Sequence, residues 1–354
     1  MGRSFENDVA AAQGAQWHVN CHVTMVSERL VFQVSPIFGV LIIAAAAADP
    51  FTFLRPTVTL SSVDLRKLEM GEPMVRVVPA DKGEVAMAGI VKVSVDGERL
   101  VAWYREIEAL KKSQFVVQIG RFSNPPRVDD LEGLTLDGSD LDDIRRCTPR
   151  DCGLKLSDAE MSQLHEAEAN AARPQKLAAV QRAFRQIMVR RVQAHLDEGT
   201  HSTPEPPKFL TLNWPQVISS IERHSSPGIE TLLYWSKERL GRGKPMISVT
   251  KLSIVRGHGE SLPDPIVIGR QLFATHYVDA SWSVTTITQG EDGSKYLVYV
   301  NQSEVDLLGG LFGGIVRAGI QRQLRGQAGG QLRALKQRLE GGYPPVRAAQ
   351  FRSD

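Results

Sequence analysis

The sequence predicts an α+β protein built around an antiparallel sheet. From Gly228 to Ser303, five consecutive stretches have strand-like patterns, each bounded by the Gly, Pro or Asp residues that turns between antiparallel strands require. The segment after them has an apolar stripe at helical spacing, and so does much of 155–222. Strands that follow one another directly, with helices grouped before and after them, are typical of the α+β class.

The chain before the meander contains a strand, a helix and a second strand. Residues 49–73 are expected to form a connector or a first short helix, and the sheet domain to begin at 74–128. Apolar or small residues alternate over 85–95, and the period then changes to helical spacing over 97–110. The stretch 114–122, QFVVQIGRF, predicts the second strand, which a Pro pair ends.

Residues 129–227 are predicted to be a helical insertion. Ser157 offers an N-cap for one or two helices that Pro174 is expected to break. A Pro-rich loop follows, and NWPQVISSIERH predicts a short helix behind it. The second part of the sheet domain, 228–342, contains the five strands and the terminal helix, and 343–354 is a tail.

The terminal helix is predicted to exceed thirty residues, with Ser303 as its N-cap and Asp306 completing a capping box. Its interior glycines cost about 0.5–1 kcal/mol each relative to alanine, so close packing on the sheet, room for a ligand, or flexibility as a lid must offset them. Its polar side is basic and is expected to be a solvated amphipathic face, with docking on an anionic membrane surface as the alternative. The basic residues are Arg317, Arg322, Arg325, Arg333, Lys336 and Arg338.

The apolar run LVFQVSPIFGVLIIAAAAADP begins at Leu30, close behind Met25 and Arg29. Its short apolar core, its alanines and the Asp-Pro that follows them favour a cleaved signal peptide over residues 25–48, with 1–24 a misassigned upstream extension. We therefore expect an exported protein, periplasmic or in the cell envelope. A membrane anchor and a buried helix of a cytosolic protein are the alternatives.

Cys147 and Cys152 flank a Thr-Pro-Arg-Asp turn. In an oxidising compartment this spacing predicts a small-loop disulfide, and two reduced thiols are the alternative. One cysteine pair without a neighbouring histidine supplies half of a zinc shell, so no metal is expected. No phosphate-loop or dinucleotide pattern occurs, and the net charge of +2 gives no argument for nucleic acid. We expect no cofactor.

The order of elements resembles the START-like, or helix-grip, superfamily, which includes polyketide cyclases and lipid-transport proteins. The likeness rests on VKVSVDGERLVAWYREIEAL as opening strand and helix, and on YLVYVNQSEVD before the terminal helix. It covers roughly residues 84–121 and 228–340, and the insertion departs from the usual pattern. The resemblance implies a curved antiparallel sheet that grips the long C-terminal helix, with an apolar tunnel between them.

We expect the concave face of that sheet to line the tunnel, with ordinary core packing as the alternative for each residue. The aromatic candidates are Trp103, Phe115, Trp235, Phe273, Tyr277, Trp282 and Tyr299. Lys237, Arg239 and Arg121 are candidates to pair with an anionic head group at the tunnel mouth, or are solvated strand ends. His276 is a weak catalytic candidate, as a strand histidine that orients a ligand or acts as a general base, or is structural.

These observations predict a protein that binds or transfers a hydrophobic small molecule, a lipid by the resemblance. Two alternatives stay open. One is an enzyme of the same fold, of cyclase or hydrolase type, that uses His276 with Tyr277 or Tyr299. The other is a cell-envelope interaction protein whose interior its own side chains fill.

Overall fold

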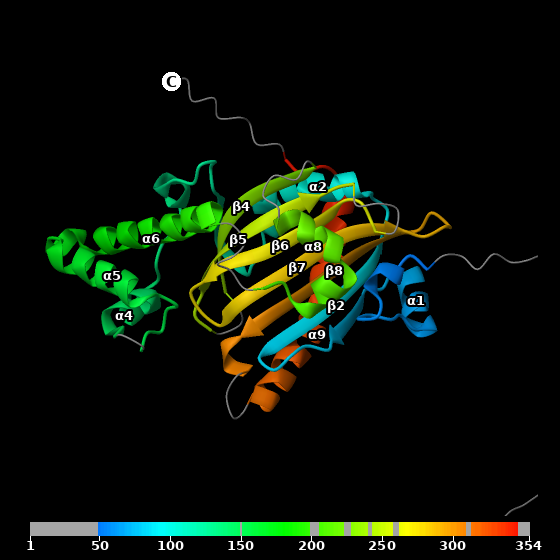
Figure 1. Cartoon of the computed structure of the whole chain (residues 1–354), viewed down its shortest axis with the longest axis horizontal. Coiled ribbons are helices and arrows are strands. Elements are labelled where there is room, and N and C mark those ends of the chain that lie inside the picture. The colour runs from blue at the N-terminus through cyan, green and yellow to red at the C-terminus, as the bar shows by residue number, and fades with distance from the viewer. Residues whose placement is uncertain are drawn as a thin grey trace, which may run out of the picture. The chain divides into compact units, whose positions relative to one another are not determined.

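The computed structural model describes residues 49–148, 151–198, 205–222, 228–239, 243–257, 262–308 and 313–345 (Figure 1). Its centre is one eight-stranded antiparallel sheet, curled and unclosed, with the order β1-β2-β8-β7-β6-β5-β4-β3. The α+β prediction is therefore confirmed. The strands are β1 Met74–Val78, β2 Glu84–Val93, β3 Val116–Arg121, β4 Ile229–Glu238, β5 Met246–Val255, β6 Ile266–Ala274, β7 Val278–Gln289 and β8 Lys295–Val305.

The helices precede, interrupt and follow the sheet. Those before β3 are η1 Thr52–Leu54, α1 Ser62–Glu69, α2 Gly97–Arg105 and α3 Ile107–Lys111. The predicted insertion between β3 and β4 contains η2 Val128–Leu131, α4 Gly138–Arg146, α5 Asp158–Asn170, η3 Arg173–Gln175, α6 Lys176–Glu198, α7 Lys208–Asn213 and α8 Pro215–Glu222. After the sheet come η5 Asp306–Leu308 and α9 Gly313–Glu340.

The two faces of the sheet have different partners. On the inner face, Leu252, Val267 and Leu297 pack with residues of α2, α3 and α9. On the outer face, Trp282 and its neighbours pack with η1, α1, α7 and α8, while Trp235 and its neighbours pack with α4, α5 and α6. Figure 1 shows α8 in front of the sheet and α9 behind it. We assign a residue to the inner face when it shares a hydrophobic cluster, or a row of paired strand residues, with Leu252. A residue that shares one with Trp282 or Trp235 is assigned to the outer face.

β1 was not predicted as a separate strand. It is five residues long, and only its two end residues are fully buried, so its alternation is weak. Pairing with β2 holds it at the edge of the sheet, and Arg76 ties it to the preceding segment by donating to Asp64 and to the carbonyl of Thr59. Tertiary pairing, rather than local pattern, therefore decides this strand.

The predicted start of the terminal helix is wrong. β8 continues to Val305, and Ser303 lies within it, paired with Val85 on one side and Ser281 on the other. Two ladders of backbone hydrogen bonds outweigh a single capping side chain. After η5, helix α9 spans 28 residues rather than more than thirty.

α9 packs along β1 and β2, where a glycine of the strand allows close approach. A Cβ built on Gly89 would lie 2.6 Å from Leu332 Cδ1. By contrast, a Cβ at Gly319, Gly326 or Gly330 of α9 would meet nothing within 4 Å. Close packing thus explains the glycine of the strand and not these glycines of the helix.

The insertion holds the predicted disulfide. Cys147 and Cys152 are joined, with their Cα atoms 4.3 Å apart. Among the described residues, no helix is long and apolar enough to cross a membrane. Residues 1–48, and with them the predicted extension and signal peptide, lie outside the described part of the chain.

We predict that Gly89→Ala lowers the free energy of unfolding by about 1–3 kcal/mol, because the added methyl group would overpack against the buried Leu332. Urea denaturation measures the change. The matched control is Gly326→Ala, which we expect to raise stability by about 0.5–1 kcal/mol. Unchanged stability in Gly89→Ala would contradict this packing of α9 on β2.

Candidate functional site

Along β4 and β5 the inner face changes from apolar to polar residues. Leu232 and Leu252 are paired and belong to the apolar cluster under α2 and α9. The next inner-face pair is Tyr234 with Thr250, and the pair after it is Ser236 with Ser248. Inner-face positions of the neighbouring strands are also polar. They include Gln271, Ser281, Ser283, Asn301 and Ser303.

A row of polar side chains crosses four strands on this face. Arg121 of β3 pairs with Tyr234 of β4, which pairs with Thr250 of β5, which pairs with Gln271 of β6. Residues in register lie on the same face of a sheet and about 5 Å apart. Side chains distant in sequence are thus aligned across the inner face.

Lys111 of α3 forms an ion pair beside Tyr234 of this row. Lys111 Nζ lies 2.5 Å from Glu238 Oε1 of β4 and donates a 3.3 Å hydrogen bond to the Tyr234 hydroxyl. Ser236 donates to the same Glu238 oxygen at 2.7 Å, and its hydroxyl lies 3.3 Å from that of Ser248. The Lys111 and Glu238 side chains keep exposed fractions of 28% and 18%. Solvent therefore reaches a pair that protein surrounds on several sides.

The titratable groups at this site hold their ordinary charge states. Burial by itself would lower the pKa of Lys111, but the charge and hydrogen bonds of Glu238 and Tyr234 raise it. Burial would raise the pKa of Glu238, but the charge and hydrogen bond of Lys111, with the Ser236 hydroxyl, lower it. Burial raises the pKa of Tyr299 to about 12 and also raises that of Tyr104. Near neutral pH the site thus holds one cation, one anion and neutral phenols.

The inner face is more accessible than the outer face along the middle of β7 and β8. Thr250, Ser283 and Tyr299 are partly exposed although they lie on interior strands. Their outer-face neighbours, such as Val249 and Val284, are 1% exposed. Along the middle of β7 and β8 solvent therefore reaches the inner face alone, whereas on β4 and β5 it also reaches outer-face residues such as Thr231 and Lys251.

Gln271 adds an unused hydrogen-bond donor to this face. Its side chain is 9% exposed, and its Nε2 has no hydrogen-bond partner among the described residues. A buried amide without a partner costs about 1–3 kcal/mol, and such groups usually bind water or a ligand. We call Tyr104, Lys111, Tyr234, Glu238, Thr250, Gln271, Ser283 and Tyr299 the inner-face site.

A second polar cluster joins α4 to the outer side of the sheet. Lys237 is fully buried, lies 2.6 Å from Asp137 Oδ1, and donates to the carbonyl of Thr135 at 2.7 Å. Asp140, also fully buried, lies 3.8 Å from Lys237 Nζ, and its Oδ1 is 3.5 Å from His276 Nε2. We call Asp137, Asp140, Lys237 and His276 the α4 junction.

The structure corrects two predictions here. Lys237 does not stand at a tunnel mouth but is buried in the α4 junction on the outer side, because strand alternation places it on the same face as Trp235. His276 is in the turn between β6 and β7 and not in a strand. Its neighbour Tyr277 has a φ of 64°, and its hydroxyl accepts from the backbone N–H of Lys244 at 2.8 Å.

The predicted aromatic lining divides between the two faces. The predicted face is wrong for Trp235, Phe273 and Trp282, which pack in the outer clusters. Tyr299 lies on the inner face. Trp103 packs among residues of α2 and α9, and its Nε1 donates to the carbonyl of Gly342 at 3.0 Å.

The remaining predicted residues lie around β3. Phe115 is half-buried, and its carbonyl accepts from the backbone N–H of Arg239 at 2.8 Å. Arg121 begins the inner-face row and donates to the carbonyl of Arg105 at 2.8 Å. The structure therefore brings Arg121 and Tyr299 to the inner face, and Lys237 and His276 to the α4 junction.

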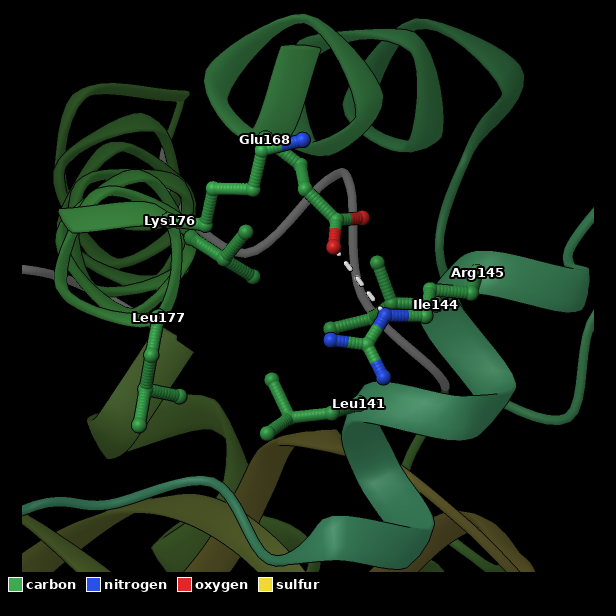
Figure 2. A pocket seen from close by; sticks show the side chains of 7 residues that line it. Leu141, Ile144, Arg145, Glu168, Lys176 and Leu177 are labelled. Atoms are coloured by element: carbon green, nitrogen blue, oxygen red, sulfur yellow. Dashed lines mark hydrogen bonds and ion pairs between the residues drawn. The ribbon is translucent and has the colours of Figure 1, made fainter. Parts of the chain in front are cut away.

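A surface pocket lies within the insertion, between α4, α5 and α6 (Figure 2). Figure 2 shows the ion pair of Arg145 and Glu168 across it, 3.0 Å apart. Its empty volume is about 200 Å³ including open solvent, below the roughly 300–1,000 Å³ of typical ligand pockets. We therefore do not place the functional site there.

Comparisons with known proteins do not assign a family. No family model matches the chain, and neither curated proteins nor solved structures show significant similarity to it. The fold itself is compatible with a helix-grip arrangement, with an antiparallel sheet and a C-terminal helix.

The sequence analysis missed most of the inner-face site. The signal was present in β4, where Leu233, Trp235 and Lys237 alternate with Tyr234 and Ser236. Trp235 and Lys237 of the first set were predicted to line the tunnel or its mouth, because aromatic residues are typical of such linings. The hydroxyl-bearing set, which lies on the inner face, was the better indicator.

We predict that Glu238→Gln destabilises the protein by about 3 kcal/mol near neutral pH, because it leaves the Lys111 charge without its partner. Since the pKa of Glu238 is lowered on folding, the stability it contributes is present above about pH 4.3 and is lost as the pH falls further. Denaturation of both proteins between neutral and acid pH measures this. A constant difference across that range would contradict the assignment.

Proposed function

We propose that this protein binds a small molecule with an apolar body in the space along the inner face of the sheet. The observation that carries the proposal is the one-sided accessibility of the middle of β7 and β8, combined with the unpartnered Nε2 of Gln271 among the described residues. The polar part of the inner face lies outside both the packed outer face and the apolar cluster under α2 and α9, so the core does not require it. Space with convergent polar groups beside apolar residues is typical of small-molecule sites.

The inner face offers both parts of such a site. The apolar part is the edge of the cluster under α2 and α9, where Tyr104, Ile119 and Tyr299 are partly exposed. The polar part is the row from Tyr234 to Gln271, one inner-face position beyond Leu252 of that cluster. An amphipathic ligand, such as a lipid, fits this division, and the resemblance to helix-grip proteins supports the same location.

The charge states favour binding over acid–base catalysis. Lys111 stays protonated, Glu238 stays ionised, and the phenols of Tyr104 and Tyr299 stay neutral, so none is poised to exchange a proton near pH 7. His276 is 6% exposed and faces Asp140 in the α4 junction. An enzyme using His276, and an envelope protein without a ligand, are therefore the alternatives to the proposal.

We also propose that the protein is exported and that it contacts a membrane through α9. The disulfide in the insertion suits an oxidising compartment. On α9, Arg317, Lys336 and Arg338 donate to backbone carbonyls. Arg322, Arg325 and Arg333 are exposed, and we propose that these three meet an anionic membrane surface.

The test is whether a bulky side chain on the inner face blocks binding. We expect native mass spectrometry with organic extraction to detect a bound small molecule, or the purified protein to bind the uncharged dye N-phenyl-naphthylamine. Thr250→Trp should weaken dye binding more than about tenfold, or about 1.4 kcal/mol, by filling the space. The matched control is Thr231→Trp, at an exposed outer-face position of β4, which should bind as the wild type does.

Two results would overturn the proposal. One is a wild-type protein that carries no small molecule and binds no dye. The other is dye binding that Thr250→Trp leaves intact while circular dichroism shows the variant to be folded.

A further inference from the structure

We infer that the ligand has an uncharged polar end that accepts hydrogen bonds, and that Gln271 and its neighbours hold this end. The inference rests on the proposed function and specifies its ligand class. It excludes a carboxylate or phosphate head group at the site. It follows from the charges of the inner face, from its donors, and from the order of polar and apolar positions along the strands.

The charges of the inner-face site cancel. Lys111 is its cation, and Glu238 already neutralises it at 2.5 Å with the help of Ser236. A ligand carboxylate placed beside this pair would meet the Glu238 carboxylate as well, and its desolvation would lack compensation. A ligand ammonium placed beside the pair would likewise be repelled by the Lys111 ammonium.

The other cations of these strands do not stand beside Gln271. Lys237, Lys251 and Arg270 lie on the outer face, where Lys237 binds Asp137, and Lys244 is paired with Asp143. Arg121 donates to the carbonyl of Arg105, and its charge contributes to lowering the pKa of Glu230 at the far end of β4. At the Gln271 end of the row, three strands from Arg121, the described inner-face residues therefore provide no positive charge that would select an anion.

The row does provide neutral donors. Gln271 Nε2 is a buried N–H donor without a partner among the described residues, and Thr250 beside it is partly exposed. Leaving the Gln271 donor unpaired is costly, so a ligand oxygen that accepts from it gains the bond without displacing a protein partner. Carbonyl, hydroxyl, ether and ester oxygens meet this requirement and carry no charge.

The spacing along the strands positions the rest of the ligand. Thr250 and Leu252 of β5 are consecutive inner-face positions, about 7 Å apart, and Ile254 follows at the same interval. Leu252, Ile254 and Val267 are themselves covered, so a polar end at Gln271 places an aliphatic body along the partly exposed edge of their cluster, at Tyr104 of α2 and Tyr299 of β8. Fatty alcohols, monoacylglycerols and similar neutral amphiphiles have this order of groups, whereas fatty acids and phospholipids have a charged end.

The test uses ligands that share one chain and differ in the head group. Dodecanol, dodecanoate and dodecylammonium compete at neutral pH with N-phenyl-naphthylamine bound to the full-length protein. We expect dodecanol to displace the dye at about tenfold lower concentration than either charged ligand, which corresponds to about 1.4 kcal/mol. Equal or tighter binding of dodecanoate or dodecylammonium would overturn the inference while leaving the proposed function in place. Failure of the dye itself to bind would instead refute the proposed function.

A variant tests the role of Gln271. Gln271→Leu keeps the size of the side chain and removes the donor, so dodecanol should lose about tenfold in affinity. The dye has no oxygen that could accept from Gln271, so its binding reports whether the site still forms in the variant. The matched control, Gln323→Leu on the exposed side of α9, should bind dodecanol as the wild type does. Unchanged dodecanol affinity in Gln271→Leu would contradict the assignment.

Discussion

The packing of the outer face of the sheet is the constraint on which the rest of this structure depends. Two groups of helices cover that face, and Trp282, Trp235 and Val249 are each no more than 2% exposed there. Burial of this apolar area supplies a core of its own. The central part of the inner face is thereby not needed for the core, and it carries polar residues, some of them partly exposed, such as Thr250 and Ser283.

β4 shows how the insertion serves this division. Lys237 and Glu238 are adjacent, carry opposite charges and point to opposite faces of one strand. Each is largely buried and needs a partner, and the two partners come from different helical segments: Asp137 from the start of α4, and Lys111 from the end of α3. The insertion and α3 therefore hold the end of β4 from both sides, which fixes the position of Glu238 in the site.

The fold was more predictable from the sequence than the site. Local periodicity was enough for the five strands of the meander and for the break of the insertion helices at Pro174, where η3 separates α5 from α6. It failed at β1 and at Ser303, because pairing between distant strands decides both. The disulfide of Cys147 and Cys152 was predicted from their spacing together with the expected export to an oxidising compartment.

The site was hidden for a different reason. Alternation predicts which residues of a strand share a face, but not which face meets which layer of helices. The sequence analysis assigned Trp235 and Trp282 to the helix-gripping face because aromatic residues suggest a tunnel. In the structure they form the outer core, and polar residues such as Thr250 and Gln271 occupy the other face. The partner of Lys111 depends on a contact between residues 127 positions apart, which no local pattern reveals.

The most direct test of this account is a high-resolution crystal structure of the purified protein, with attention to the density beside Gln271. The account predicts a ligand, or ordered water in an open space, within hydrogen-bond distance of Gln271 Nε2 and bordered by Thr250 and Ser283. An inner face closed by protein side chains, with the Gln271 amide bonded to one of them, would contradict it.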